Sequence, residues 1–547
     1  MQKAKKMYSQ LKTKSYFAAL GFIALMISFV KLKLSIGDGN FTDFCHQGEY
    51  FNALLSVLLQ KEFIPISTHG ALDYVPGALS ISLFGMDKYL LPTEIFYIIS
   101  SLLASLFLFF ITLKHAISKE QIFIAGFLIP HLVTYKDLFL LSSLFVYFCL
   151  SSQKRKNENS NVLLILLGLS ASINFFWSFN RGLAGLISIG VPLLYLSIKD
   201  RKNIIAVVSF LSFATLLSLT YPSLSLPHYL ENIIFLKKTS YQWSYGFKKD
   251  PLILSVFIGS LLVLVNILIS KNILTQKNKL LKANALLLAL LSLCFFQIST
   301  SRADMGHIGM GLIAFFIVLN YWSYAQKINL ETNKRFDIIL IILICLIIFA
   351  WGIYYRHGYA TGLIIYIFSI FHAKTESFLT KRFNNVFKKI LYAILIIYLT
   401  SILFSIYKKW NNGAYEWTKR ILSLPSKSQM VNSDILWVTE ELLKVKSSCI
   451  LDMSNNGVIN ALANLPTCTK FSYIVYADKN YENEIIKSIA NKKPNAIVYS
   501  SNVWSYSIDN ISMVTRFPEL DKLLTSIYKY KKCNKDYCIL YLIPQEK

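Results

Sequence analysis

One stretch of the chain gathers side chains that could move protons or hold a cation. The segment 35–76 contains a group of carboxylates and imidazoles in a chain that is 54% hydrophobic: Asp38, Asp43, His46, Glu49, His69 and Asp73. A carboxylate close to an apolar region can be shifted toward its neutral form and accept a proton at neutral pH. The segment therefore predicts general-base chemistry beside a membrane.

Asp43 is the candidate catalytic base. Asp43, His46 and Glu49 follow one another at spacings of three, so they would share one face if this segment is helical. Asp38 is the alternative base, although its glycine neighbours also suit a simple turn. The competing interpretation of both residues is that they are ordinary solubilising carboxylates of an exposed loop.

His69 and Asp73 form a second pair in the same segment. They are four residues apart, so at a helix start the carboxylate could orient the imidazole. Together with His46 and Glu49 they could bind a divalent cation such as Mg²⁺ or Mn²⁺, with Asp43 as a further ligand. The spacing matches no specific metal motif, and a hydrogen-bonded structural histidine is the alternative.

Two later positions carry arginine between apolar runs. Arg181 lies at the end of one run, and Arg302, Asp304 and His307 lie close together between two others. Guanidinium groups suit phosphate recognition, so these residues are candidates for binding a phosphate or pyrophosphate. The alternatives are an arginine that extends to lipid headgroups and a structural pair of Arg302 with Asp304.

These residues belong to a chain built for lipid. Only 16% of its residues are charged, against about 25% in ordinary soluble proteins, and apolar runs recur along the first 410 residues. The composition predicts a polytopic α-helical membrane protein. We expect about 13 spans, at 16–34, 94–113, 121–135, 138–152, 161–177, 182–198, 203–221, 251–270, 283–299, 306–324, 337–355, 359–373 and 389–407.

The placement of charge predicts the orientation. With a cytoplasmic N-terminus, the cytoplasmic segments hold most Lys and Arg of the first 407 residues, and the opposite segments hold about half as many. This topology places the segment 35–93, Arg181, Arg302 and the chain after residue 408 outside the cytoplasmic membrane. No nucleic-acid-binding motif accompanies the net charge of +26, so we expect no nucleic-acid partner.

The segment 35–93 is the first outer loop of this topology. Its apolar stretches 51–63 and 72–85 are too short to span a bilayer. We expect them to lie at the membrane interface or to pack on the helices.

The pattern changes after residue 407. Alternating strands and helices predict a small extracytoplasmic α/β domain over 408–547, following a membrane module over 1–407. We expect strands at 449–454, 471–477, 495–501, 511–515 and 538–543, and helices at 455–465, 480–493 and 519–532. Cys533 and Cys538 flank a possible hairpin tip where a disulfide is feasible, and Cys449 could pair with Cys468.

With these residues placed, the chain resembles bacterial members of the glycosyltransferase C superfamily, polytopic enzymes that take a sugar from a polyprenyl-phosphate donor. The order of the motifs, their predicted placement on one side and the α/β tail also resemble that group. The motifs that carry the resemblance are Asp43-Phe44-Cys45-His46-Gln47-Gly48-Glu49, His69-Gly70-Ala71-Leu72-Asp73, Asn180-Arg181-Gly182 and Arg302-Ala303-Asp304-Met305-Gly306-His307.

The resemblance implies an inverting sugar transfer to a glycan or lipid-linked acceptor. It implies that Asp43 deprotonates the acceptor hydroxyl, which attacks the anomeric carbon. Arg181, Arg302 and His307 would stabilise the charge on the departing lipid phosphate. The chain departs from the pattern at Asn180 and Gln47, where many relatives have an acidic residue, and both departures weaken a metal assignment.

Two other classes compete with this interpretation. A polymerase or ligase of the O-antigen type would rely on arginines and a histidine in large later loops. A transporter or flippase for lipid-linked sugars would show charged residues at mid-membrane and two related halves, and we find no internal repeat. The acid-rich first loop favours sugar transfer over both.

Overall fold

The computed structural model describes most of the chain. The described residues are 2–33, 44–60, 69–152, 159–198, 200–220, 226–243, 250–274, 279–300, 309–327, 415–454, 456–477, 479–500, 507–508 and 511–542, with scattered residues between 344 and 407. All structural statements below refer to these residues.

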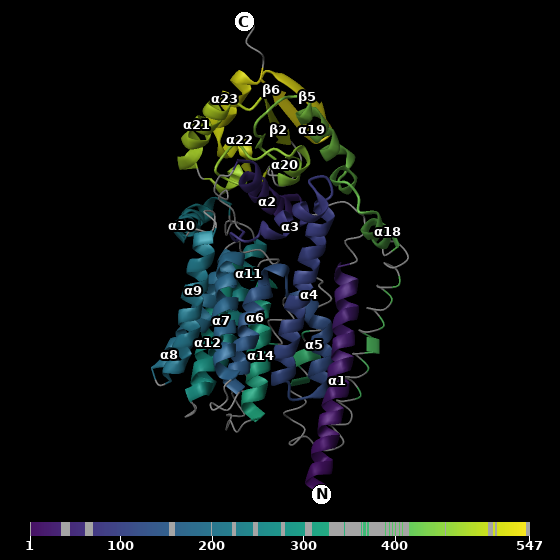
Figure 1. Cartoon of the computed structure of the whole chain (residues 1–547), viewed down its shortest axis with the longest axis vertical. Coiled ribbons are helices and arrows are strands. Elements are labelled where there is room, and N and C mark those ends of the chain that lie inside the picture. Colours follow the sequence, from purple (N-terminus) through teal and green to yellow (C-terminus); the bar gives the residue numbers. More distant parts are fainter. Residues whose placement is uncertain are drawn as a thin grey trace.

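The N-terminal part is a bundle of apolar helices, which we call the helical module (Figure 1). Each of the first ten predicted spans overlaps one of its helices, and the last three fall mainly outside the described residues. The helices are α1 (Gln2–Lys33), α4 (Leu90–His115), α5 (Lys119–Leu132), α6 (Leu138–Ser152), α7 (Asn159–Trp177), α8 (Phe179–Ser197), α9 (Ile204–Thr220), α11 (Asp250–Leu274), α12 (Lys279–Thr300) and α14 (Leu312–Lys327).

Length and composition identify the membrane-crossing helices. Within the described ranges, five helices are long and apolar enough to cross a bilayer, or six if α5 and α6 form one broken span. The five lie at Leu90–His115, Ser160–Trp177, Phe179–Ser197, Arg201–Leu219 and Lys279–Ser299. The predicted class, a multi-pass helical membrane protein, is confirmed.

The chain bends sharply between α5 and α6. The two helices differ in direction by 108°, and the short 3-10 helix η2 (Tyr135–Asp137) occupies the break. Two charged residues, Lys136 and Asp137, therefore sit at a helix break rather than inside a continuous span.

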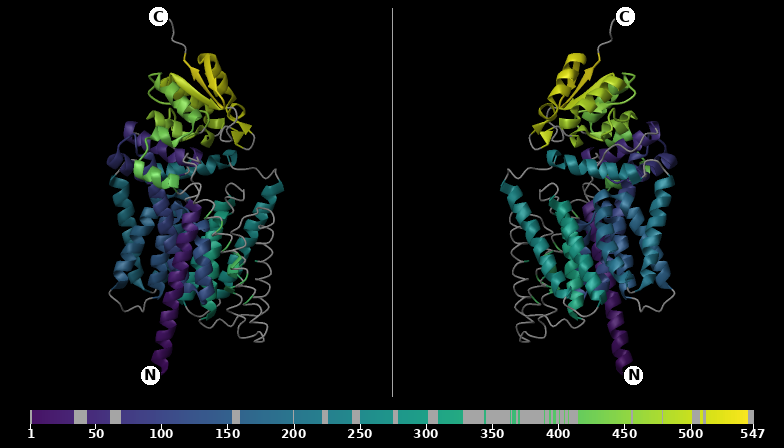
Figure 2. Two further views of the ribbon diagram at one scale, coloured as in Figure 1. Left: turned by 90° about the vertical axis from the view of Figure 1, so that its right-hand side faces the viewer. Right: turned by 90° about the vertical axis from the view of Figure 1, so that its left-hand side faces the viewer.

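Three further helices lie between the helical module and the C-terminal domain, at the end opposite the N-terminus (Figure 1). They are α2 (Phe44–Leu55), continued by the π-helical turn η1 (Ser56–Gln60), α3 (Val75–Phe84) and α10 (Leu226–Trp243). Both side views place them at this junction (Figure 2). The residues from Phe51 to Val57 are buried, so this apolar stretch packs against protein on several sides.

The C-terminal domain, described over 415–542, is a mixed α/β structure. Its main sheet has the order β1-β2-β6-β5, with β1 parallel to β2 and the other neighbours antiparallel. The strands are β1 (Leu451–Asp452), β2 (Ala496–Ser500), β5 (Tyr530–Asn534) and β6 (Tyr537–Tyr541), with a separate pair, β3 (Ser507–Ile508) and β4 (Ile511–Ser512).

The helices of the domain lie around this sheet, except for α18 (Tyr415–Ser423), which lies apart from it at the upper end of the helical module (Figure 1). The helices around the sheet are α19 (Ser433–Leu443), α20 (Gly457–Ala463), α21 (Glu482–Lys492), α22 (Met513–Arg516) and α23 (Pro518–Ile527), with short 3-10 turns η6 (Lys427–Met430), η7 (Ile474–Tyr476) and η8 (Lys479–Tyr481). The small α/β domain predicted from the sequence is confirmed.

Three local predictions for this domain are wrong. The strand expected at 511–515 covers only Ile511–Ser512, and helix α22 begins at Met513. The segment 471–477 was expected to be a strand, but it contains the 3-10 turn η7, and its residues are buried against other elements. The expected helix over 519–532 ends at Ile527, because residues from Tyr530 pair with β6. Packing and strand pairing within the domain override local propensity at these places.

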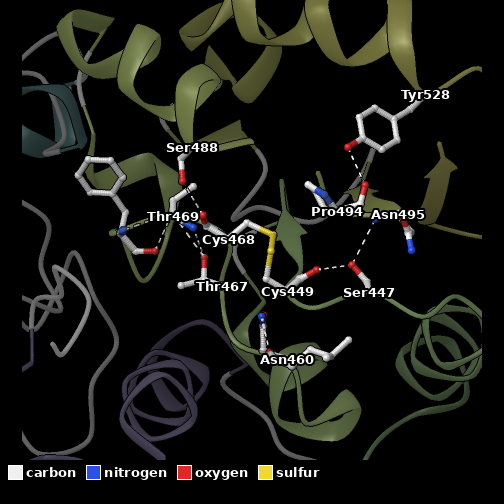
Figure 3. The surroundings of a disulfide bond; sticks show 12 residues. Ser447, Cys449, Asn460, Thr467, Cys468, Thr469, Ser488, Pro494, Asn495 and Tyr528 are labelled. Atoms are coloured by element: carbon white, nitrogen blue, oxygen red, sulfur yellow. Dashed lines mark hydrogen bonds between the residues drawn. A yellow bond between two sulfur atoms is a disulfide. The ribbon is translucent and has the colours of Figure 1, made fainter. Parts of the chain in front are cut away.

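Two disulfides brace the domain. Cys449 is bonded to Cys468 in the interior, where Ser447 and Ser488 donate hydrogen bonds of 2.7 Å to the carbonyl oxygens of the two cysteines (Figure 3). Cys533 is bonded to Cys538 across the β5–β6 hairpin, where the two residues are directly paired. Both pairings considered from the sequence are present.

Candidate active site

A histidine lies between two carboxylates at the junction. His69 Nε2 lies 3.2 Å from Glu49 Oε2, and His69 Nδ1 contacts Asp73 Oδ2. All three side chains are buried. The spacing of four residues between His69 and Asp73 does bring them together, but across the turn that precedes α3 rather than on a helix.

The two carboxylates control the charge of this imidazole. Burial and the nearby Lys136 ammonium both disfavour the protonated ring, but Glu49 and Asp73 outweigh them and raise the pKa of His69 above its ordinary value of 6.5. Two carboxylates on opposite ring nitrogens stabilise the imidazolium form, in which both nitrogens donate. The site therefore favours a cationic His69.

The break between α5 and α6 supplies the next residues. Lys136 Nζ lies 3.4 Å from His69 Nε2, and the Tyr135 hydroxyl lies 3.3 Å from His69 Nδ1. From α4, the Tyr97 hydroxyl donates to the Asp73 carbonyl oxygen at 2.6 Å, and its ring lies against Tyr135. The helix break thus places an ammonium group against the histidine.

A buried ion pair lies next to Lys136, the residue that precedes Asp137 in the sequence. Arg181 Nε donates to Asp137 Oδ1 at 2.9 Å, and both side chains are almost fully buried. The other oxygen of Asp137 accepts from the Thr134 backbone N–H at 2.8 Å and from its hydroxyl at 2.9 Å. Arg181 therefore pairs inside the protein. The interpretation in which it extends to lipid headgroups is wrong.

A glycine lets the turn that contains His69 lie close to the end of α7. We call this turn, residues 69–74, the histidine segment. A Cβ on Gly70 would lie 2.2 Å from the backbone carbon of Trp177, so only glycine fits without a shift of the chain. The Leu72 N–H donates to the Phe176 carbonyl at 2.9 Å, and the Trp177 indole N–H donates to the Tyr135 carbonyl at 3.2 Å. The end of α7 therefore holds the histidine segment and the α5–α6 break in one place.

The C-terminal domain also reaches the site. The Tyr476 hydroxyl donates to Glu49 Oε2 at 2.8 Å, although the two residues are 427 positions apart. Glu49 therefore contacts one residue of the histidine segment and one of the C-terminal domain.

The predicted site residues fall into two groups. Glu49, His69 and Asp73 are brought together, and Arg181 joins Asp137 beside them. His46 belongs to α2, and its side chain is outside the described part of the chain, as are these residues: Asp38, Asp43, Arg302, Asp304 and His307. In the sequence, Asp43 directly precedes the first residue of α2.

Sequence inspection missed three residues of this cluster. Lys136 and Asp137 are consecutive charged residues between two apolar runs on the predicted outer side, a pattern that marks functional positions in membrane proteins. That signal could have identified them. Tyr476 had no signal, because only the fold brings the C-terminal domain onto Glu49.

The surroundings of Glu49 do not fit a divalent cation. Its Oε2 atom already faces the His69 imidazole and the Tyr476 hydroxyl, and Lys136 contributes a further positive charge beside His69. Within the described ranges, no group of three His, Cys, Asp or Glu side chains could hold a metal ion. The metal prediction for Asp43 and His46 concerns side chains outside those ranges.

These observations define a class of protein: a multi-pass helical membrane protein with a buried, ionisable site where its membrane module meets a C-terminal α/β domain. No protein-family model matches the chain, and no characterised protein matches it by sequence.

Solved structures provide the remaining comparison. The chain is similar to ArnT from Cupriavidus metallidurans, bound to undecaprenyl phosphate (10% identity, 97% of this chain and 98% of that chain, TM-score 0.47) and in the apo state (TM-score 0.49). It is also similar to the archaeal oligosaccharyltransferase AglB from Archaeoglobus fulgidus in complex with an inhibitory peptide and a dolichol-phosphate (10% identity, 98% and 75% of the two chains, TM-score 0.46). Because these likenesses are distant, we base the functional proposal on the residues of this chain.

Proposed function

We propose that this protein is a membrane glycosyltransferase of the glycosyltransferase C type. It moves a sugar from a polyprenyl-phosphate-linked donor to a cell-surface glycan or a lipid-linked acceptor. The transfer takes place outside the cytoplasmic membrane, with the N-terminus in the cytoplasm and the C-terminal domain outside, as the distribution of Lys and Arg predicts.

One observation carries the proposal: the buried cluster of Glu49, His69, Asp73 and Lys136 at the end of a membrane module. Ionisable groups next to a bilayer are costly to bury, and they are retained mainly where they bind or react with something. The Lys136 ammonium beside this charge-balanced histidine suits a phosphate that lies at the end of a lipid. The sequence resemblance of the surrounding motifs points to the same donor class.

In the proposed reaction the acceptor hydroxyl loses its proton to the Asp43 carboxylate, with Asp38 as the alternative base. The hydroxyl oxygen forms a bond to the anomeric carbon of the sugar as the bond from that carbon to the lipid phosphate breaks. The electron pair of the broken bond stays on the phosphate oxygen. Attack from the face opposite the leaving group inverts the anomeric carbon.

The cations then have a defined task. Negative charge grows on the departing phosphate, and pre-placed positive groups stabilise it at that moment. Lys136 is the described candidate, and Arg302 and His307 are the further ones. Both ring nitrogens of His69 face carboxylates, so the imidazolium balances those carboxylates and does not touch the phosphate. Asp73 and Glu49 keep the imidazole charged, and Arg181 neutralises Asp137 behind them. Any Mg²⁺ or Mn²⁺ ion would need ligands other than Glu49, and no step depends on it.

The test is to express Asp43→Asn beside the wild type in a strain that lacks the chromosomal copy. General-base removal typically costs about 100-fold or more in rate, so we expect the surface glycan to lose one sugar at unchanged protein level. Asp38→Asn is the matched control, because it removes the neighbouring carboxylate of the same segment.

Each outcome separates the candidate functions. Loss of the sugar in Asp38→Asn alone moves the role of base to Asp38. Normal glycans in both variants remove Asp43 and Asp38 from the role of base and contradict the proposed mechanism. Accumulation of lipid-linked sugar on the cytoplasmic leaflet identifies a flippase instead, and shortened glycan chains with intact repeat units identify an O-antigen-type polymerase.

A further inference from the structure

The C-terminal domain is joined to the site by a side-chain contact. Tyr476 lies on η7 of that domain, and its hydroxyl donates to Glu49 Oε2, the same oxygen that faces His69. Glu49 is fully buried and Tyr476 is 8% exposed, so water competes little for this hydrogen bond. A carboxylate oxygen shared by a hydroxyl donor and an imidazole is fixed in direction.

The backbone around this contact is unusually close. A Cβ on Gly48 would lie 2.7 Å from the Gly457 nitrogen, and one on Gly457 would lie 2.2 Å from the Gly48 carbonyl oxygen. Both positions therefore need glycine, and helices α2 and α20 touch through their main chains. One turn further along α2, the Asn52 amide donates to the Ser472 carbonyl at 2.9 Å.

These contacts set the position of α2 relative to the C-terminal domain. The glycine pair fixes the distance between α2 and α20, and the Asn52 bond fixes the rotation of α2 about its axis. Glu49 lies between Gly48 and Asn52 on that helix, where its side chain meets Tyr476. The C-terminal domain thereby controls where the Glu49 carboxylate stands against His69.

We propose that Tyr476 is a positioning residue of the site: its hydroxyl holds the Glu49 carboxylate against His69, so the C-terminal domain completes the active site. The part of this inference that concerns catalysis rests on the proposed function. The competing account is that Tyr476 only adds stability where two parts of the protein meet.

The first experiment is kinetic. Full-length wild type, Tyr476→Phe and Tyr499→Phe are reconstituted in nanodiscs with a panel of tritiated undecaprenyl-phosphate sugars, and cell-envelope membranes serve as the acceptor source. Tyr499→Phe is the matched control, since Tyr499 donates to Asp521 at 3.2 Å within the same domain and away from the junction.

We expect Tyr476→Phe to lower kcat about tenfold with an unchanged KM for the donor, because a hydrogen bond to a charged group is lost without loss of a substrate contact. Tyr499→Phe keeps the wild-type kcat. Equal kcat values for wild type and Tyr476→Phe overturn the positioning role. A raised KM with unchanged kcat also overturns it, because Tyr476 would then be a donor-binding residue.

The second experiment needs no substrate. The thermal midpoints of Tyr476→Phe, Glu49→Gln and the double variant form a double-mutant cycle in nanodiscs. Coupled residues give a double variant whose midpoint falls by less than the sum of the single shifts, and additive shifts overturn the inference. If the wild type consumes no donor, the proposed function fails while this cycle still decides whether Tyr476 holds Glu49.

Discussion

Two buried polar regions of the molecule differ in kind. At the junction, the region around His69 contains carboxylates, an ammonium group and a buried arginine–aspartate pair. Deep in the helical module, two buried polar contacts of α12 and α14 join neutral groups. Asn284 donates to the Tyr321 hydroxyl at 2.7 Å, and the Tyr366 hydroxyl donates to Asn320.

The difference shows what helix packing needs and what it does not. Neutral amide–hydroxyl pairs are enough to join helices in a membrane protein, and each contributes only about 0.6 kcal/mol on average. Serine and threonine hydroxyls in α4 donate to backbone carbonyl oxygens of the preceding turn of the same helix, as Ser101 and Thr112 do. Packing alone therefore does not account for the ionisable groups at the junction, which is why we propose a charged ligand there.

The largest expected effect is a loss of sugar transfer when a residue at the junction is changed. His69→Gln keeps a polar side chain but removes the cation between Glu49 and Asp73. We expect transfer of labelled sugar to fall about 100-fold, because Glu49 and Asp73 would be left unbalanced beside Lys136, the cation that stabilises the developing negative charge. Product formation in nanodiscs, normalised to folded protein, measures it.

The matched control lies in the neutral region. Tyr321→Phe removes the hydroxyl that accepts from Asn284 and leaves the ring in place. We expect a loss of about 0.6 kcal/mol in stability and unchanged sugar transfer. Equal activity losses in His69→Gln and Tyr321→Phe would remove the distinction between the regions.

A smaller effect follows from the raised pKa of His69. A group whose pKa is higher in the folded state stabilises the fold fully below its unfolded value of 6.5, and this stabilisation is lost as pH rises through the folded pKa. The thermal midpoint of the wild type should therefore exceed that of His69→Gln most at acidic pH, with the difference shrinking as pH rises. A difference that grew toward alkaline pH would contradict an imidazolium held by two carboxylates.

The sequence predicts much of this architecture. Long apolar runs identify the helices, since length and composition alone decide whether a helix can cross a bilayer. The short spacing of His69 and Asp73 correctly suggests their contact, because four residues of turn or helix bring two side chains together. The sequence also favours the Cys533–Cys538 pair, because the two residues flank a short hairpin loop, whereas it leaves the Cys449–Cys468 pairing open.

The rest depends on contacts between distant segments. The α5–α6 break was expected as a plain connection between two spans, and its lysine reaches His69 only because the end of α7 holds both segments. The Tyr476–Glu49 contact joins residues that no periodicity relates. The segment 471–477 has the composition of a strand, and the packing of its domain folds it into a 3-10 turn that delivers Tyr476.

The most direct measurement is an experimental structure of the full chain with undecaprenyl phosphate added. The account predicts the lipid phosphate at the junction, with an oxygen within about 3 Å of Lys136 Nζ, and with Asp43 and Arg302 facing the same pocket. A phosphate bound at the opposite end of the helical module, or beside the neutral pairs of α12 and α14, would contradict it.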